Sequence, residues 1–108
     1  MAWEELGPVA SLADGDASQY ARETDAFVVC RIGEDVFVLD DECPHSGGPL
    51  SMGNFSPPLL ICPWHAWEFD CRSGQCVHSP KAAVRRYPVE IRDGLIFADL
   101  PDSSRSGE

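Results

Sequence analysis

A chain of 108 residues has room for one ordinary domain, so we expect a single domain over 1–108 whose last residues, 101–108, form a frayed tail. The formal charge of −10, from 18 acidic and 8 basic residues, opposes nucleic-acid binding because such a surface repels phosphates. No apolar run approaches the length that crosses a bilayer, and the opening segment has no basic and apolar leader. We therefore expect no membrane contact and a cytoplasmic location.

The predicted elements begin weakly and then become clear. Residues 3–12 are compatible with an opening strand, whereas 13–24 mix turn and helix formers and receive no assignment. Two β-rich runs follow at about 26–32 and 36–40, and the polar residues 33–35 between them have the length and chemistry of a hairpin turn. This part of the chain therefore predicts a β-hairpin.

The second half repeats the pattern of short runs and turns. The runs LLICP and AWEFD predict two short strands, and a turn signal follows them at 73–74. Near the end, RRYPVEI and LIFADL flank the turn residues 92–94 and predict a closing hairpin. The spacing of turns indicates an all-β fold, a small antiparallel sandwich or barrel.

Two loops between these strands each carry a cysteine and a histidine. Cys43 and His45 form one pair, and Cys62 and His65 form the other. The total of five cysteines is odd, which in a cytoplasmic protein favours metal binding or free thiols over a disulfide framework. Thiolate and imidazole together select zinc or an iron–sulfur cluster over magnesium or calcium.

The order of the four candidate ligands favours one of these metals. Zinc-finger patterns group the two cysteines and then the two histidines. Here the types alternate, as is needed to seat a two-iron cluster with both cysteines on one iron and both histidines on the other. We favour a [2Fe–2S] cluster and keep a closed zinc site as the alternative.

The remaining cysteines and histidine have simpler interpretations. Cys30 lies in the middle of a predicted strand and is expected to be buried packing. Cys71 and Cys76 bracket a turn and could face each other across a hairpin, but a cytoplasmic protein keeps such thiols reduced, so we treat them as structural. His78 has no partner at ligand spacing.

The segments CPHSGGPL and CPWHAWEFD resemble the two cluster-binding boxes of the Rieske [2Fe–2S] family. The resemblance covers about 28–100 and implies an antiparallel β fold that holds one cluster between two loops at one tip. It also implies that Cys43 and Cys62 bind the buried iron and that His45 and His65 bind the outer iron.

Four positions separate this chain from the Rieske subunits of respiratory complexes that it also resembles. Those subunits have a disulfide-forming cysteine in each box, where this chain has Gly48 and Trp64. They also place a serine and a tyrosine where this chain has Trp67 and Phe69. Because two hydroxyl donors near the cluster are missing, we expect a potential toward the low end of the roughly −150 to +300 mV range of Rieske centres.

The resemblance also bears on function. Ring-hydroxylating oxygenases share the Rieske boxes but need a further iron held by two histidines and a carboxylate, and His78 is the one histidine left over. The chain therefore resembles a soluble Rieske-type ferredoxin, like those of biphenyl and naphthalene dioxygenases: an electron-transfer component, not itself an enzyme. We expect a monomeric carrier that passes single electrons from a flavin-dependent reductase to a terminal oxygenase, with the acidic surface steering transient docking.

Two other functions stay open at this point. One is a small Rieske-like subunit of a larger redox enzyme such as nitrite reductase, which a stably bound large subunit would indicate. The other is a zinc-stabilised interaction module with no redox role.

Overall fold

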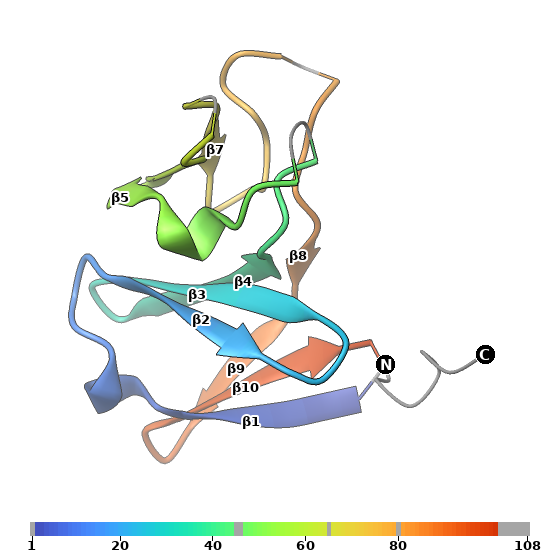
Figure 1. Ribbon diagram of the computed structural model, residues 1–108. Coiled ribbons are helices and arrows are strands. Elements are labelled where there is room, and N and C mark those ends of the chain that lie inside the picture. The colour runs from blue at the N-terminus through green and yellow to red at the C-terminus, as the bar shows by residue number, and fades with distance from the viewer. Residues whose placement is uncertain (1, 45–46, 65, 80, 102–108) are drawn as a thin grey trace.

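The strands of the chain form three layers in the computed structural model, which describes residues 2–44, 47–64, 66–79 and 81–101 (Figure 1). The strands are β1 (Ala2–Pro8), β2 (Ala17–Ala21), β3 (Ala26–Ile32), β4 (Asp35–Asp40), β5 (Asn54–Ser56), β6 (Leu59–Ile61), β7 (Glu68–Asp70), β8 (Arg86–Tyr87), β9 (Val89–Arg92) and β10 (Leu95–Leu100). Within the described residues they make three antiparallel sheets, ordered β1-β10-β9, β2-β3-β4-β8 and β5-β6-β7. Single 3-10 turns, η1 (Val9–Ser11) and η2 (Leu50–Met52), join some of them. The predicted all-β antiparallel fold is confirmed.

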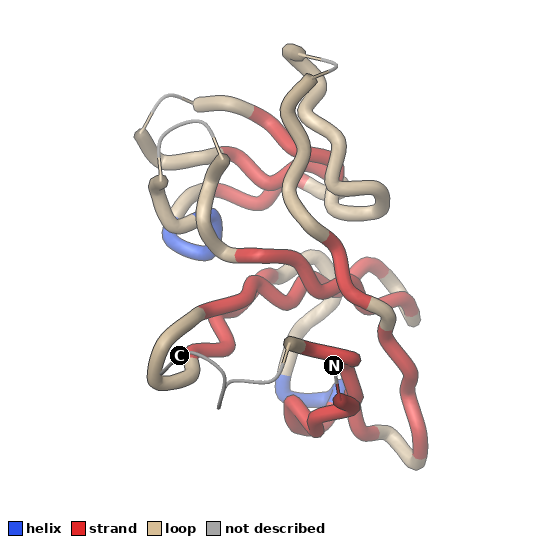
Figure 2. Tube along the Cα trace, turned by 90° about the vertical axis from the view of Figure 1, so that its right-hand side faces the viewer, coloured by secondary structure: helices blue, strands red, loops and turns tan. Residues whose placement is uncertain are grey.

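The sheet β2-β3-β4-β8 is the middle layer, and it is buried on both faces. The β1-β10-β9 sheet lies on one side of it, and the β5-β6-β7 sheet lies on the other (Figures 1 and 2). Phe27 and Val29 of β3 belong to the core on the first side, whereas Val28 and Cys30 belong to the core on the second. Such double burial explains why the run AFVVC at the start of β3 is continuously apolar and does not alternate. The chain thus has two cores, one on each side of its middle sheet.

The two predicted hairpins are confirmed. β3 and β4 pair through Ile32 and Asp35, leaving a two-residue turn in which Gly33 has a φ of 63°. In the β9–β10 turn both Asp93 and Gly94 have positive φ, 53° and 76°, as the favoured two-residue hairpin turn requires.

Other parts of the chain differ from the sequence-based expectation. The run RRYPVEI is split at Pro88, so that Arg86–Tyr87 pairs with β4 while Val89–Arg92 pairs with β10. Proline has no N–H to donate, and it marks the point where the chain passes from one sheet to another. The unassigned segment 13–24 contains strand β2.

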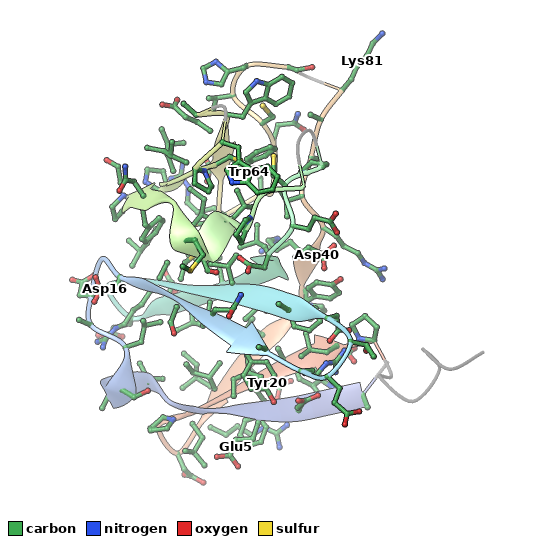
Figure 3. The ribbon with its side chains drawn as sticks, in the orientation of Figure 1. Glu5, Asp16, Tyr20, Asp40, Trp64 and Lys81 are labelled. Carbon is green, nitrogen blue, oxygen red and sulfur yellow. The ribbon has the colours of Figure 1, made fainter. Side chains whose placement is uncertain are left out.

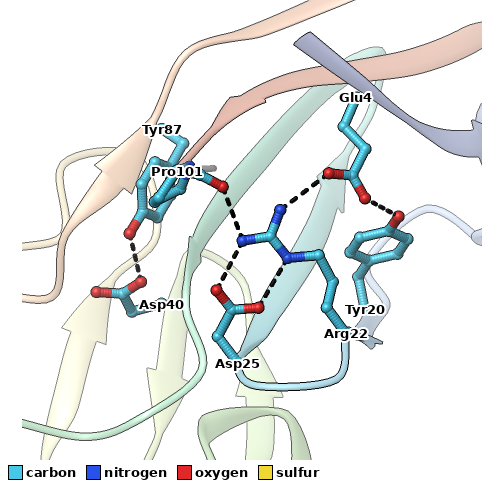
Figure 4. A network of polar contacts seen from close by, with 7 residues as sticks. All are labelled: Glu4, Tyr20, Arg22, Asp25, Asp40, Tyr87 and Pro101. Carbon is cyan, nitrogen blue, oxygen red and sulfur yellow. Dashed lines mark hydrogen bonds and ion pairs between the residues drawn. The ribbon is translucent and has the colours of Figure 1, made fainter. Parts of the chain in front are cut away.

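A polar network fastens β1 and the end of β10 to the β2–β3 turn (Figure 4). Arg22 forms a two-pronged ion pair with Asp25, at 2.7 and 2.6 Å, and also donates to Glu4 at 2.9 Å and to the Pro101 carbonyl at 2.9 Å. Tyr20 donates to the same Glu4 carboxylate, and burial together with this bond raises the pKa of Tyr20 to about 12. The network therefore joins the lower two layers at one edge.

In the part of the chain that the structure describes, no helix is long and apolar enough to cross a membrane.

Candidate metal centre

The first cysteine loop, which we call loop 1, spans 41–50 between β4 and η2. Cys43 is only 1% exposed, and its N–H donates to the Gly48 carbonyl at 2.9 Å. Its own carbonyl accepts from the Gly47 N–H at 2.8 Å, and Gly47 has a φ of 80°. The positive φ explains a glycine at this turn, because other residues adopt that conformation only with strain. The loop folds back on Cys43 and turns its thiol toward the core.

The second cysteine loop, loop 2, spans 62–67 and joins β6 to β7. Cys62 is 2% exposed, its N–H donates to the Trp67 carbonyl at 2.8 Å, and its carbonyl accepts from the Ala66 N–H at 3.0 Å. Ala66 has a φ of 58°, so it occupies the place that Gly47 holds in loop 1. The two loops therefore share one backbone pattern around their cysteines.

Gly48 brings the two loops into contact at the end of the molecule where Trp64 lies (Figure 3). A Cβ atom at Gly48 would lie 3.2 Å from the Cys62 Sγ atom and 3.1 Å from the Trp64 ring. Cys43 and Cys62 also belong to one buried cluster of side chains. The structure thus brings together the two predicted cysteine ligands. The predicted histidine ligands, His45 and His65, lie outside the described residues.

Loop 1 is also fixed against the strand that leads into loop 2. A Cβ atom at Gly53, just after η2, would lie 1.9 Å from the Ile61 carbonyl oxygen at the end of β6. No side chain fits in that space, so here glycine is required by close approach and not by its φ, which is −87°.

The other cysteines lie beneath the loops. Cys30, Cys71 and Cys76 are buried in the same cluster as the candidate ligands, and no disulfide joins Cys71 to Cys76. A hydrogen bond to Cys71, followed by burial, raises the pKa of the Cys30 thiol. The expectation that these cysteines are packing residues agrees with their positions. His78 is half exposed, with its Nε2 atom 3.5 Å from Glu68.

Sequence reasoning did not single out Asp41, the buried charged side chain of the described residues, at 3% exposed. It sits at the entrance to loop 1 and accepts a hydrogen bond from the Ser51 N–H at 2.6 Å and one from the Ser51 hydroxyl at 2.8 Å. The available signal was the second of two acidic residues that follow the apolar run VFVL, with a serine on the far side of the cysteine box.

A pair of buried cysteines on matching loops suits a soft metal, because thiolates favour iron–sulfur clusters and zinc. The fold and these loops define a class: small antiparallel β domains that hold a metal centre between two loops at one tip.

Comparison with known proteins identifies the family. Residues 2–88 match the Rieske [2Fe-2S] domain, and the chain belongs to this family. It is 30% identical to the anthranilate 1,2-dioxygenase ferredoxin subunit of Burkholderia cepacia over 103 residues, which cover 91% of this chain and 92% of that subunit.

Two further matches show how widely the domain occurs. The chain is 36% identical to the methylxanthine N1-demethylase NdmA of Pseudomonas putida over 84 residues, which cover 70% of this chain but only 24% of the demethylase. It also superimposes with a TM-score of 0.83 on a chain from a complex of oxygenase and ferredoxin of carbazole 1,9a-dioxygenase, at 22% identity, covering 90% of this chain and 92% of that one. The predicted family, fold and cofactor, one Rieske-type [2Fe–2S] cluster, are confirmed, and the family favours the cluster over zinc.

Proposed function

We propose that the chain is a ferredoxin that carries single electrons from a flavin-dependent reductase to a terminal oxygenase. One observation carries this proposal: the chain covers nearly all of a dioxygenase ferredoxin subunit and places two buried cysteines on paired loops at one tip. The bound cluster would supply a reversible one-electron couple. The chain itself is then an electron-transfer component and not the oxygenase.

Four residues would hold the cluster in this proposal. Cys43 and Cys62 would bind the inner iron, and His45 and His65 would bind the outer one. Because two neutral imidazoles replace two thiolates, the centre is easier to reduce than a four-cysteine cluster. Three large apolar side chains support the inner side, since Leu50, Leu60 and Phe69 are buried in the same cluster as the cysteines and exclude water there.

The surroundings of the cysteines support a potential at the low end of the Rieske range. Phe69 is fully buried against the cysteine cluster, and Trp67 packs on it while partly exposed. Neither side chain carries a hydroxyl group that could stabilise the more negative, reduced centre by donating a hydrogen bond.

The acidic surface beside loop 1 supports docking of a partner with a basic patch. An open hollow there is lined by Cys43, by Arg22, which is paired with Asp25, and by an excess of carboxylates, namely Glu23, Asp25, Asp40, Asp41 and Glu42. An excess of negative charge around such a hollow raises the encounter rate with a positively charged partner, and this effect weakens as salt is added. We assign this role toward a terminal oxygenase and a reductase, with the chain acting as a monomer.

The first experiment tests the cofactor and its ligands. Purified protein should contain iron and acid-labile sulfide, and its dithionite-reduced form should give a [2Fe–2S] electron paramagnetic resonance signal. His45→Ala and His65→Ala should each abolish that signal. His78→Ala is the matched control and should retain it, because His78 lies beside Glu68 on the protein surface.

Three results would contradict the proposal. Protein that contains zinc and no acid-labile sulfide would favour a zinc-stabilised interaction module over an electron carrier. Loss of the signal in His78→Ala together with its retention in His65→Ala would refute the ligand assignment. A large subunit that stays bound through purification would favour the small subunit of a larger redox enzyme. A redox titration should follow a one-electron curve.

A further inference from the structure

Asp41 places a buried carboxylate at the root of loop 1. Its Oδ1 atom accepts from the Ser51 N–H at 2.6 Å, and its Oδ2 atom accepts from the Ser51 hydroxyl and from the Gln19 amide, both at 2.8 Å. Three donors thus surround one carboxylate that is 3% exposed. A buried negative charge is tolerated only with such partners.

The backbone of Asp41 closes the same loop. Its carbonyl accepts from the Leu50 N–H at 2.6 Å, and its N–H donates to the Ala26 carbonyl of β3 at 3.2 Å. Backbone and side chain together therefore tie the start of loop 1 to its end and fasten both to the middle sheet. Cys43 lies inside the segment that these bonds enclose.

The charge also lies close to the buried thiols. Asp41 and Cys43 line the same hollow. After the hydrogen bond to Cys71 and burial, the Asp41 carboxylate is a further cause of the raised pKa of the Cys30 thiol. Cys30 belongs to the same buried group of side chains as Cys43 and Cys62, so Asp41 lies beside the core that contains both candidate ligands.

We propose that Asp41 is a positioning residue that closes loop 1 around Cys43 and whose fixed negative charge lowers the reduction potential of the cluster. The proposal rests on the ligation by Cys43 and Cys62 proposed above. Adding an electron next to a buried carboxylate is unfavourable, because the low dielectric of the interior screens the repulsion weakly. This effect adds to that of the absent hydroxyl donors at Trp67 and Phe69.

The central test is Asp41→Asn, which keeps the shape and removes the charge. The amide oxygen can still accept from the Ser51 N–H, the Ser51 hydroxyl can rotate to accept, and the Gln19 amide can turn to present its oxygen. The potential should rise enough to change the ratio of reduced to oxidised protein at least tenfold at a fixed electrode potential, about 59 mV for one electron.

The matched control is Glu42→Gln, which removes the same charge one residue nearer to Cys43 but from an exposed side chain. Solvent and salt screen such a charge, so the ratio should change about twofold or less, and the change should shrink as salt is raised. The shift in Asp41→Asn should persist in salt. Equal shifts in the two variants, or an unshifted Asp41→Asn protein with an intact spectrum, would overturn the proposal.

Ser51→Ala keeps the proposal testable if Asp41→Asn does not assemble. This variant removes one donor and leaves the carboxylate less neutralised, so the potential should fall, opposite to Asp41→Asn, and a chelator should strip the cluster faster. A potential that stays unchanged or rises in Ser51→Ala would contradict the electrostatic role. If the wild-type protein itself gives no [2Fe–2S] signal, the proposed function fails instead, and the two failures are thereby distinguished.

Discussion

Loop 1 and loop 2 hold their cysteines with the same backbone hydrogen bonds but reach that shape by different means. Loop 2 is closed by strand pairing, because Ile61 and Glu68 on either side of it are paired residues of β6 and β7. Loop 1 leaves the middle sheet at β4 and enters another layer at β5, and the side chain of Asp41 bonds to Ser51 across its ends. Loop 2 thus depends on the pairing of its flanking strands, whereas loop 1 combines a backbone bond, from the Leu50 N–H to the Asp41 carbonyl, with side-chain bonds of Asp41.

This difference predicts how each loop responds to change. A hairpin loop is positioned by its own strands, so changes within it act mainly through local backbone strain. A loop that joins two layers depends on contacts between residues distant in sequence, so changes at its ends also alter the packing of those layers. Four sets of substitutions, from the largest expected effect to the smallest, test this view.

The largest effect should come from the ligands, where the two loops should behave alike. Cys43→Ser and Cys62→Ser should each abolish the visible absorbance of the cluster and its bound iron, because each would remove a thiolate that we propose as a ligand of the inner iron. Cys76→Ala is the control: it alters a buried cysteine of the same core without a proposed ligand role, and it should keep the absorbance. A Cys43→Ser protein with full absorbance would remove loop 1 from the site.

Much of this architecture could be predicted because its signals are local. The two hairpins follow from apolar runs that flank turn residues, and positive φ at Gly33 and Gly94 explains the glycines there. The cysteine boxes could be found for the same reason, since each pair of candidate ligands lies within a few residues. Cys43 and Cys62 lie in one buried cluster, and the ligand roles of these cysteines and of His45 and His65 stay predictions.

The missed features depend on partners far away in sequence. β2 is a short strand with exposed polar residues, and it exists because it pairs with β3 along its whole length. Pro88 lies between β8 and β9, and these two strands are distinguished by their partners, because β8 pairs with β4 and β9 pairs with β10. Asp41 resembles an ordinary surface acid until Ser51 and Gln19 are placed around it. Propensity and spacing carry no information about such nonlocal pairs.

The next largest effect should come from Gly53→Ala, which disrupts the contact between η2, at the end of loop 1, and β6, which leads into loop 2. Its Cβ atom would meet the Ile61 carbonyl oxygen at 1.9 Å, so β6 and η2 must separate, at a cost of about 3 kcal/mol in the free energy of unfolding. Thermal unfolding measures the loss. Gly33→Ala is the control, with positive φ and no atom near its Cβ, and should cost about 1 kcal/mol. Equal losses of stability in Gly53→Ala and Gly33→Ala would show that the Ile61 carbonyl moves away from the new methyl group without strain.

A smaller effect is expected at Gly48→Ala, where loop 1 touches loop 2. The added methyl group would meet the Cys62 Sγ atom and the Trp64 ring at 3.2 and 3.1 Å, and we expect a cost of about 1.5 kcal/mol and faster loss of the cluster to a chelator. Trp64 is 60% exposed, so its ring can be removed with little loss of core. In the double variant with Trp64→Ala the methyl group should cost less, and an unchanged cost would show that the ring is not the obstacle.

The smallest effects should come from exchanging alanine and glycine at the residue of each loop that has a positive φ. Ala66→Gly in loop 2 relieves the strain of a φ of 58°, and the greater entropy of glycine in the unfolded chain offsets part of the gain, so we expect about 0.5 kcal/mol of added stability. Gly47→Ala in loop 1 introduces the same strain at a φ of 80° and should cost about 1 kcal/mol.

Space does not complicate the exchange in loop 1, because a Cβ atom at Gly47 would meet the Glu42 carboxylate only at an ordinary 3.6 Å. The two changes should therefore shift the thermal midpoint in opposite directions and add when combined to a net loss of about 0.5 kcal/mol, since each acts on its own turn. A loss much larger than additivity predicts would mean that the loops are coupled through the shared cluster. Repeating the measurement on protein stripped of metal would then restore additivity, because the cluster that would bridge the two cysteine turns is gone.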